Sequence, residues 1–270
     1  MKIGIGLPHR IRDVRPDTVP AWGRVSEEAG CSSLGALGRI PYAGVMGGLT
    51  SGPLPASVRR PVLSAKEGAG IDAVSGGRRA RGLEWGGRAD DSVVDGLGPW
   101  GTTKRLGQST ETDRSVRRGE VPPGCENQAV PAGTREPPPL FCGTAQASFD
   151  GVARSGRGYV APSAPPVAVG PAFDRVRTAW RTAGREGTPY PVALANFAPG
   201  DEHRGGAAVH DSCRPTGSEG TRARAAEMRA RIAGVRATAD AVEELGVDEL
   251  MFNPTVDDLD HVARPADAVR

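Results

Sequence analysis

Three consecutive residues, Gly143, Thr144 and Ala145, have the clearest potential to bind a ligand, because they follow a short segment that we predict to be a strand. If a helix begins at this point, its first backbone N–H groups and the Thr144 hydroxyl face a ligand, and the helix dipole favours a negative charge. The pattern therefore predicts a phosphate-binding turn. An ordinary turn between a strand and a helix would have the same residues, so both interpretations remain open.

His9 is the next candidate, since it directly follows the first predicted strand, residues 2–7. A histidine here can act at the edge of a bound ring system if it lies within hydrogen-bond reach of its target. It can equally be a loop residue without a chemical role. Asp90 and Asp91 could share a proton, but adjacent residues on a loop diverge, so we interpret them as capping residues.

The sequence predicts no metal site. His203, His210 and Cys213 are spaced as H-x6-H-x2-C, and this spacing matches no standard zinc pattern. The Gly-Ile-Gly run at residues 4–6 lacks the third glycine of a dinucleotide-binding turn and lies inside a predicted strand. Signatures of a P-loop, a serine-hydrolase elbow and a zinc protease are also absent.

The composition excludes several classes of protein. The formal net charge is only +2, from 34 basic and 32 acidic residues, so no global charge favours nucleic acid or an anionic membrane. The four cysteines form no CxxC pair, no segment has the length of a membrane span, and no signal peptide is recognisable. We therefore expect a cytoplasmic protein with reduced thiols, without nucleic-acid or membrane partners. A group of basic residues indicates a solvated helix face: Arg222, Arg224, Arg229, Arg231 and Arg236.

The order of the predicted elements indicates an α/β fold. Strands are predicted at residues 2–7, 31–37, 79–85, 139–142, 157–161, 191–198 and 247–252. Helices are predicted from Asp17 and Thr18 to Gly30, at 62–74, at 173–184, and from Met228 to Leu245. Strands that alternate with helices imply a parallel sheet with helices outside. Three segments lack a pattern, near 43–60, 119–139 and 202–221, and the first of them should contain a helix and the third strand. Two glycines inside the second helix, Gly68 and Gly70, each cost about 1 kcal/mol relative to Ala.

Four runs in order resemble the luciferase-like flavin-dependent oxidoreductases. The first strand, first helix and second strand of that family are similar to MKIGIGLP and AWGRVSEEAGCSSLGALGRI, and its most specific segment is similar to VLSAKEGAGIDAVSGGRRARGLEWGGRADD. Its later units are similar to PLFCGTAQASFDGVARSGRGYVA, DRVRTAWRTAGREG and LGVDELMFNPTVDDLDHVARPADAV. The resemblance covers roughly two thirds of the chain. It implies that residues 1–270 form a single domain, a (β/α)₈ TIM-type barrel that is incomplete around its third strand.

The resemblance also implies a site, because the family binds its flavin at the carboxyl ends of the barrel strands. Carried over by position, the cofactor-binding residues are Pro8, His9, Gly38, Arg39, Gly82, Glu84, Gly143, Thr144 and Ala145. The implied cofactor is FMN or the deazaflavin coenzyme. Two positions depart from the family: Gly38 has no side chain where the family often has an acidic residue or a histidine, and Glu84 with Trp85 replaces a small, apolar stretch. No residue is assigned a catalytic role.

The activity that the resemblance implies is that of an oxidoreductase, in its oxygen-using form a monooxygenase, which acts on a small organic substrate. The departures favour an alternative, in which the chain is a catalytically inactive relative that serves as a partner subunit, or the product of a decayed gene. Uptake of flavin by the purified protein separates the two interpretations. Self-association into a homo-oligomer is left open by the sequence.

Overall fold

The structure is a computed structural model, and it describes residues 1–8, 11, 14–36, 53–84, 93, 96, 101–198, 200–213 and 232–269. Several of the predictions above concern residues outside these ranges. They are His9, Gly38, Arg39, Trp85, Asp90, Asp91, Met228 and the arginines from Arg222 to Arg231.

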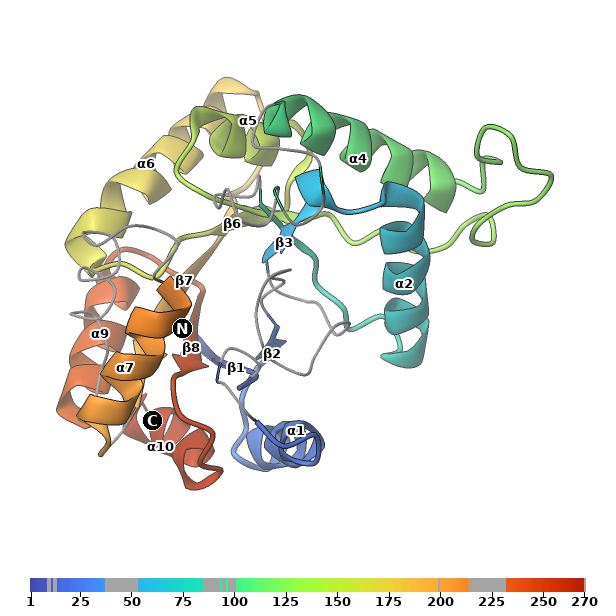
Figure 1. Ribbon diagram of the computed structural model, residues 1–270. Coiled ribbons are helices and arrows are strands. Elements are labelled where there is room, and N and C mark those ends of the chain that lie inside the picture. Colours follow the sequence, from blue (N-terminus) through green and yellow to red (C-terminus); the bar gives the residue numbers. More distant parts are fainter. Residues whose placement is uncertain are drawn as a thin grey trace.

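A curved sheet of eight parallel strands forms the centre of the molecule (Figure 1). The strands are β1 (Lys2–Gly6), β2 (Leu34–Gly35), β3 (Pro53–Pro55), β4 (Gly82–Glu84), β5 (Leu140–Cys142), β6 (Gly158–Val160), β7 (Tyr190–Phe197) and β8 (Glu249–Pro254). Across the sheet they lie in the order β2-β1-β8-β7-β6-β5-β4-β3, so the last strand returns to pair with the first. This is the strand order of a (β/α)₈ barrel. In the part of the chain that the structure describes, β2 and β3 are the two end strands, which agrees with a barrel that is incomplete around its third strand.

Helices surround the sheet on its outer side (Figure 1). They are α1 (Thr18–Glu28), α2 (Pro61–Val74), α4 (Thr102–Arg117), α5 (Gln146–Ser155), α6 (Pro166–Thr182), α7 (Glu202–Cys213), α9 (Ile232–Glu244) and α10 (Asp260–Val269), with a 3₁₀ turn η1 (Ala56–Val58) before α2. Gly30, Gly184 and Gly246 follow α1, α6 and α9 with φ angles of 69°, 68° and 71°, the left-handed conformation that ends helices. Asp17 occupies the N-cap position of α1, but its side chain makes no capping hydrogen bond. Among the described helices, none is long and apolar enough to cross a membrane.

The two faces of the sheet pack against different partners. Side chains of the outer face, including Ile5 and Phe252, belong to the main core together with Trp22 of α1 and Phe173 of α6. The Trp22 indole Nε1–H donates a hydrogen bond to the Gly6 carbonyl at 3.1 Å, which fixes α1 against β1. Side chains of the inner face form a separate apolar cluster of Leu140, Cys142, Val160 and Val192. The interior of the barrel is therefore filled by side chains, as expected for this architecture.

The seven predicted strands are all present, each within a few residues of its expected bounds. The third strand, which the sequence pattern did not place, is β3 within the segment 43–60. The prediction that residues 202–221 lack a pattern is wrong for 202–213, which form α7. The segment 119–139 has neither helix nor strand, as predicted from its composition, although Val130 within it is buried against α2 and α4 in a small apolar cluster.

Candidate functional site

The carboxyl ends of the parallel strands meet at one end of the barrel, which is here called the mouth. Pro8 lies there, two residues after β1, and is buried. Its carbonyl accepts a hydrogen bond from the Ile11 amide at 3.1 Å, and the preceding Leu7 amide donates to the Gly35 carbonyl at 2.7 Å. Leu7 is thus held beside the end of β2. His9, the next residue, lies outside the described residues.

Glu84 is the last residue of β4 and faces the inside of the barrel. Its Cα partner on β5 is Cys142, a member of the inner apolar cluster. Burial raises the pKa of the Cys142 thiol well above its usual range, and the negative charge of Glu84 raises it further. Cys142 is therefore a protonated thiol at neutral pH and does not act as a nucleophile. Gly82, the other predicted residue of this strand, lies at its amino end, about 7 Å farther from the mouth.

The turn after β5 has the geometry that the sequence predicts. Gly143 has a φ angle of 103°, a conformation that favours glycine, and its carbonyl accepts a hydrogen bond from the Tyr159 hydroxyl at 2.9 Å. Thr144 and Ala145 are exposed, and α5 begins immediately afterwards with Ala145 as its N-cap, without a side-chain capping bond. The start of α5 is therefore an uncapped helix N-terminus at the mouth, which is the local geometry of an anion site.

Two asparagines at the mouth were not predicted from the sequence. Asn196 of β7 and Asn253 of β8 are Cα partners, and only 1% and 3% of their surfaces are exposed. Within the described part of the chain, Asn196 Oδ1 and Asn253 Nδ2 have no hydrogen-bond partner. Ser163, which follows β6, is also buried, and its Oγ has no partner among the described residues. Buried polar groups are nearly always hydrogen-bonded, so three such groups at one end of a barrel indicate a place for a polar ligand.

Glycines of β1 explain how Asn253 reaches its position. A Cβ on Gly6 would lie 2.6 Å from Asn253 Oδ1, so a larger residue at position 6 would displace the amide. A Cβ on Gly4 would likewise lie too close to the side chains of Ser33 and Glu249. The alternation of Ile and Gly in β1 therefore puts isoleucine on the helix-covered face and leaves room on the inner face for side chains of β8.

The loops after β7 and β8 form the adjoining part of the rim. His261 at the start of α10 is buried, and its Nδ1 has no partner among the described residues. Burial lowers the pKa of His261, and its Nε2 lies 3.7 Å from Asp258 Oδ2. His203 and His210 lie exposed on α7. Within the described ranges, no three His, Cys, Asp or Glu side chains are grouped so that they could hold a metal ion.

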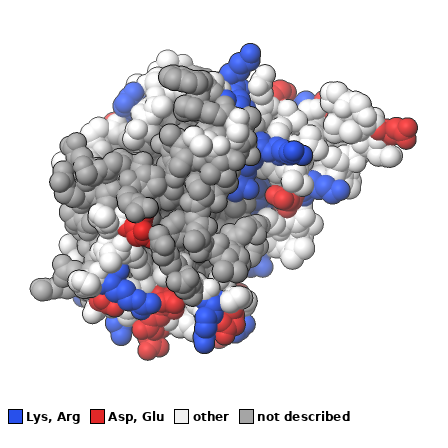
Figure 2. Space-filling model, viewed as in Figure 1, with Lys and Arg blue, Asp and Glu red and all other residues white. Residues whose placement is uncertain are grey.

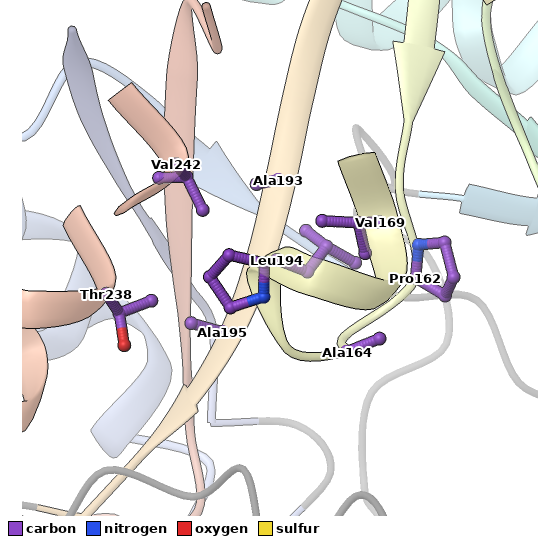
Figure 3. Close-up of a pocket in the computed structure, with 9 residues that line it drawn as sticks. Pro162, Ala164, Val169, Ala193, Leu194, Ala195, Thr238 and Val242 are labelled. Atoms are coloured by element: carbon purple, nitrogen blue, oxygen red, sulfur yellow. The ribbon is translucent and has the colours of Figure 1, made fainter. Parts of the chain in front are cut away.

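A small cavity lies between β7 and the helices α6 and α9 (Figure 3). It is lined by Val169, Ala193, Ala195, Thr238 and Val242, among others. Its volume is about 10 Å³, which is room for no more than one water molecule. Because Ala193 and Ala195 point to the helix-covered face, this cavity belongs to the packing between sheet and helices, and it is far too small for a cofactor ring.

Comparisons with known proteins identify the fold. No family model and no curated protein sequence matches the chain, but solved structures do. An F420-dependent secondary alcohol dehydrogenase has a TM-score of 0.76 at 13% identity, over 100% of this chain and 99% of that chain. The monooxygenase RslO1 from Streptomyces bottropensis has a TM-score of 0.69 at 16% identity, over 99% and 97% of the two chains. The coenzyme F420-dependent tetrahydromethanopterin reductase from Methanopyrus kandleri has a TM-score of 0.67 at 14% identity, over 99% and 98%.

These similarities extend over nearly the whole length of both chains, so the protein is an α/β barrel. More particularly, it has the fold of the F420-dependent oxidoreductases and luciferase-like monooxygenases, and the resemblance seen in the sequence motifs is confirmed at the level of the fold. The comparisons give no support to the alternative of an inactive partner subunit or a decayed gene product.

Proposed function

We propose that the protein is an oxidoreductase that binds FMN or the deazaflavin coenzyme at the barrel mouth and acts on a small organic substrate. The observation that carries the proposal is the turn after β5, where Gly143 and Thr144 lead into the uncapped start of α5. Both cofactors contain phosphate, and free N–H groups at a helix N-terminus suit a phosphate. The fold similarity to an F420-dependent dehydrogenase and to a monooxygenase supports the same reaction class.

The polar atoms without partners support a ring-shaped ligand beside the phosphate. Asn196 Oδ1 can accept a hydrogen bond and Asn253 Nδ2 can donate one. The edge of a flavin-type ring has both N–H and carbonyl groups, so one ligand would satisfy both amides. Pro8 and Glu84, at the ends of β1 and β4, would then border the same ring. The residues present at the mouth therefore fit a flavin-type cofactor.

The roles of the protein's own residues follow from this arrangement. A bound flavin-type cofactor supplies the redox chemistry. Asn196 and Asn253, held on adjacent strands, would orient the ring, and Thr144 would bind the phosphate. The apolar cluster that contains Cys142 and Val192 fills the barrel interior and excludes water from below the ring. The Cys142 thiol stays protonated because of its raised pKa, so it does not attack the substrate.

A binding titration with a matched pair of variants tests the proposal. Thr144→Asp puts a carboxylate at the expected phosphate position, whereas Thr188→Asp puts the same charge on an exposed residue in the loop before β7, at the opposite end of the barrel. We expect Thr144→Asp to weaken binding of FMN or of the deazaflavin coenzyme by about tenfold or more, through repulsion between like charges. Thr188→Asp should bind as the wild type does. The readout is the change in cofactor fluorescence on titration with protein.

Two outcomes would contradict the proposal at different levels. If the wild type binds neither cofactor, the proposed function is wrong. If the wild type binds and the two variants bind equally well, the cofactor is held elsewhere and the phosphate role of the β5–α5 turn is wrong. The cofactor that binds also indicates the chemistry, since oxygen consumption is expected only with reduced FMN.

A further inference from the structure

A group of buried arginines lies outside the barrel wall, between α2, α4 and the segment that leads into β4. Arg79, Arg81 and Arg117 have only 6%, 4% and 2% of their surfaces exposed. Basic side chains also gather on the α2 and α4 side of the face shown in Figure 2. Arginine is rarely buried unless it is paired, so each of the three guanidinium groups should have acceptors nearby.

The acidic partners do not balance these arginines. Asp113 is shared, because its Oδ2 accepts hydrogen bonds from Arg81 Nη1 and from Arg117 Nε. Asp72 is occupied by Arg135, whose Nη2 and Nε donate at 2.6 and 2.8 Å. Burial, together with the positive charges of Arg81 and Arg117, lowers the pKa of Arg79 to about 10. The cluster therefore contains more buried positive than negative charge.

Several N–H groups of this cluster have no acceptor. Among the described residues, Arg79 Nε and Nη1, Arg81 Nε and Nη2, and Arg59 Nε are buried without a hydrogen bond. Arg81 Nη2 forms an ion pair with Glu136 Oε1 at 3.6 Å, which is beyond hydrogen-bond distance. Each buried group that is left unsatisfied destabilises the fold, most strongly when it is charged. An acceptor that neutralises charge would relieve both defects.

A cavity lies beside two of these arginines. Arg59 and Arg81 line it, together with Ser64, Leu83 and Asp113, among others. Its volume is about 20 Å³, which is room for one water-sized particle. A phosphate or sulfate is too large for this space, whereas a single halide ion fits. The Asp113 carboxylate at the cavity wall is already engaged by Arg81 and Arg117, so its charge is compensated.

We propose that this cavity is a binding site for a monatomic anion, chloride in the cell, held by the N–H groups of Arg59 and Arg81. Chloride accepts hydrogen bonds from guanidinium groups and brings the missing negative charge into the cluster. The site lies outside the barrel wall and before β4, so it is separate from the mouth and does not depend on the proposed cofactor. Its function is to stabilise the packing of α2 and α4 against β4.

Thermal unfolding at constant ionic strength tests the proposal. A ligand that binds only the folded state raises the melting temperature as its concentration increases. We therefore expect chloride and bromide to raise the melting temperature of the wild type relative to gluconate, an anion too large for the cavity. Arg59→Gln should abolish this difference, because it removes one of the two side chains that hold the anion. The variant should still fold, since Arg59 is only partly buried. Arg60→Gln is the matched control, because Arg60 is exposed and does not line the cavity, and it should keep the halide effect.

Bromide in crystals of the wild type gives an independent measurement that needs no variant. An anomalous peak in the cavity, within hydrogen-bond distance of Arg59 and Arg81, would support the proposal. A peak without anomalous signal would mean that the cavity holds only water, and the proposal would be wrong. An equal effect of halides on wild type and Arg59→Gln would place any halide binding elsewhere and would also overturn it.

Discussion

Gly68 and Gly70 lie two residues apart in α2, yet the substitution of each by alanine should have opposite effects. A Cβ at Gly68 would lie 2.6 Å from Arg117 Nη2 and 2.7 Å from Arg79 Nη1, where ordinary contacts begin at 3.4 Å. A Cβ at Gly70 would meet nothing within 4 Å. Both substitutions change the helix propensity by the same amount, but only the one at Gly68 brings a methyl group against the buried arginines. A comparison of the two variants therefore measures the steric effect separately from the helix propensity.

The magnitudes can be worked from these contacts. Alanine in place of glycine favours a helix by about 1 kcal/mol at either position. At Gly68 this gain is opposed by overpacking, which costs roughly 1–3 kcal/mol. The Arg117 side chain must also move, and its Nη2 donates to the Ala65 carbonyl at 3.1 Å, a buried bond whose loss costs roughly 1–3 kcal/mol. We expect Gly68→Ala to lower the free energy of unfolding by about 1–5 kcal/mol and Gly70→Ala to raise it by up to about 1 kcal/mol.

Urea denaturation of the wild type and both variants measures the two effects, with unchanged slopes showing that only stability has changed. Thermal melting should show the same order, at roughly 2–4 °C per kcal/mol for a chain of this size. If Gly68→Ala is as stable as the wild type, the guanidinium groups do not lie against α2 and the buried cluster is described wrongly. If Gly70→Ala is clearly destabilised, the error lies in the helical conformation of α2 itself.

Two further predictions concern buried titratable groups. Cys142 should resist alkylation at neutral pH, because burial and Glu84 raise its pKa, whereas exposed Cys125 should react at once. Mass spectrometry of peptides from the alkylated native protein measures both reactions. Early modification of Cys142 would contradict its place inside the barrel. His261 has a pKa lowered by burial, so the unfolded state binds a proton more readily and the free energy of unfolding should fall as the pH drops below 6.5. His261→Gln should flatten this dependence in denaturation curves taken between about pH 5 and 7, and an unchanged slope would exclude His261 as its source.

The sequence predicted the strands well because apolar runs between glycine and proline turns are a local signal. It failed for β3, whose residues are Pro-Leu-Pro, since proline argues against a strand. The structure makes β3 an end strand of the described sheet, where proline is tolerated. The helix α7 was missed because Gly205 and Val209, its buried residues within the described stretch 203–211, form no recognisable apolar stripe, although they lie four residues apart as a helix requires.

The candidate site was only partly predictable, for a different reason. The turn at Gly143 and Thr144 was found because strand, glycine and helix start are consecutive in the chain. Asn196 and Asn253 were missed because they are 57 residues apart and come together only through the pairing of β7 with β8. A usable signal existed, since Asn196 interrupts the apolar run of β7 and Asn253 directly follows the apolar run 250–252 of β8. Gly68 shows the same limit: the sequence indicates its cost to the helix, but only the fold shows which side chains lie against it.

The buried polar groups at the two ends of the barrel differ in whether they have hydrogen-bond partners. At the amino ends of the strands, Glu249 accepts hydrogen bonds from the hydroxyls of Ser32, Ser33 and Tyr190. A carboxylate with three donors is stabilised where it is, so this end holds the fold together. At the mouth, by contrast, polar atoms of Asn196 and Asn253 have no partner among the described residues. These amide groups destabilise the protein while no ligand is bound, and their presence is explained if a bound ligand makes hydrogen bonds to them. The same division is general in (β/α)₈ barrels, in which one end stabilises the fold and the other binds the ligand.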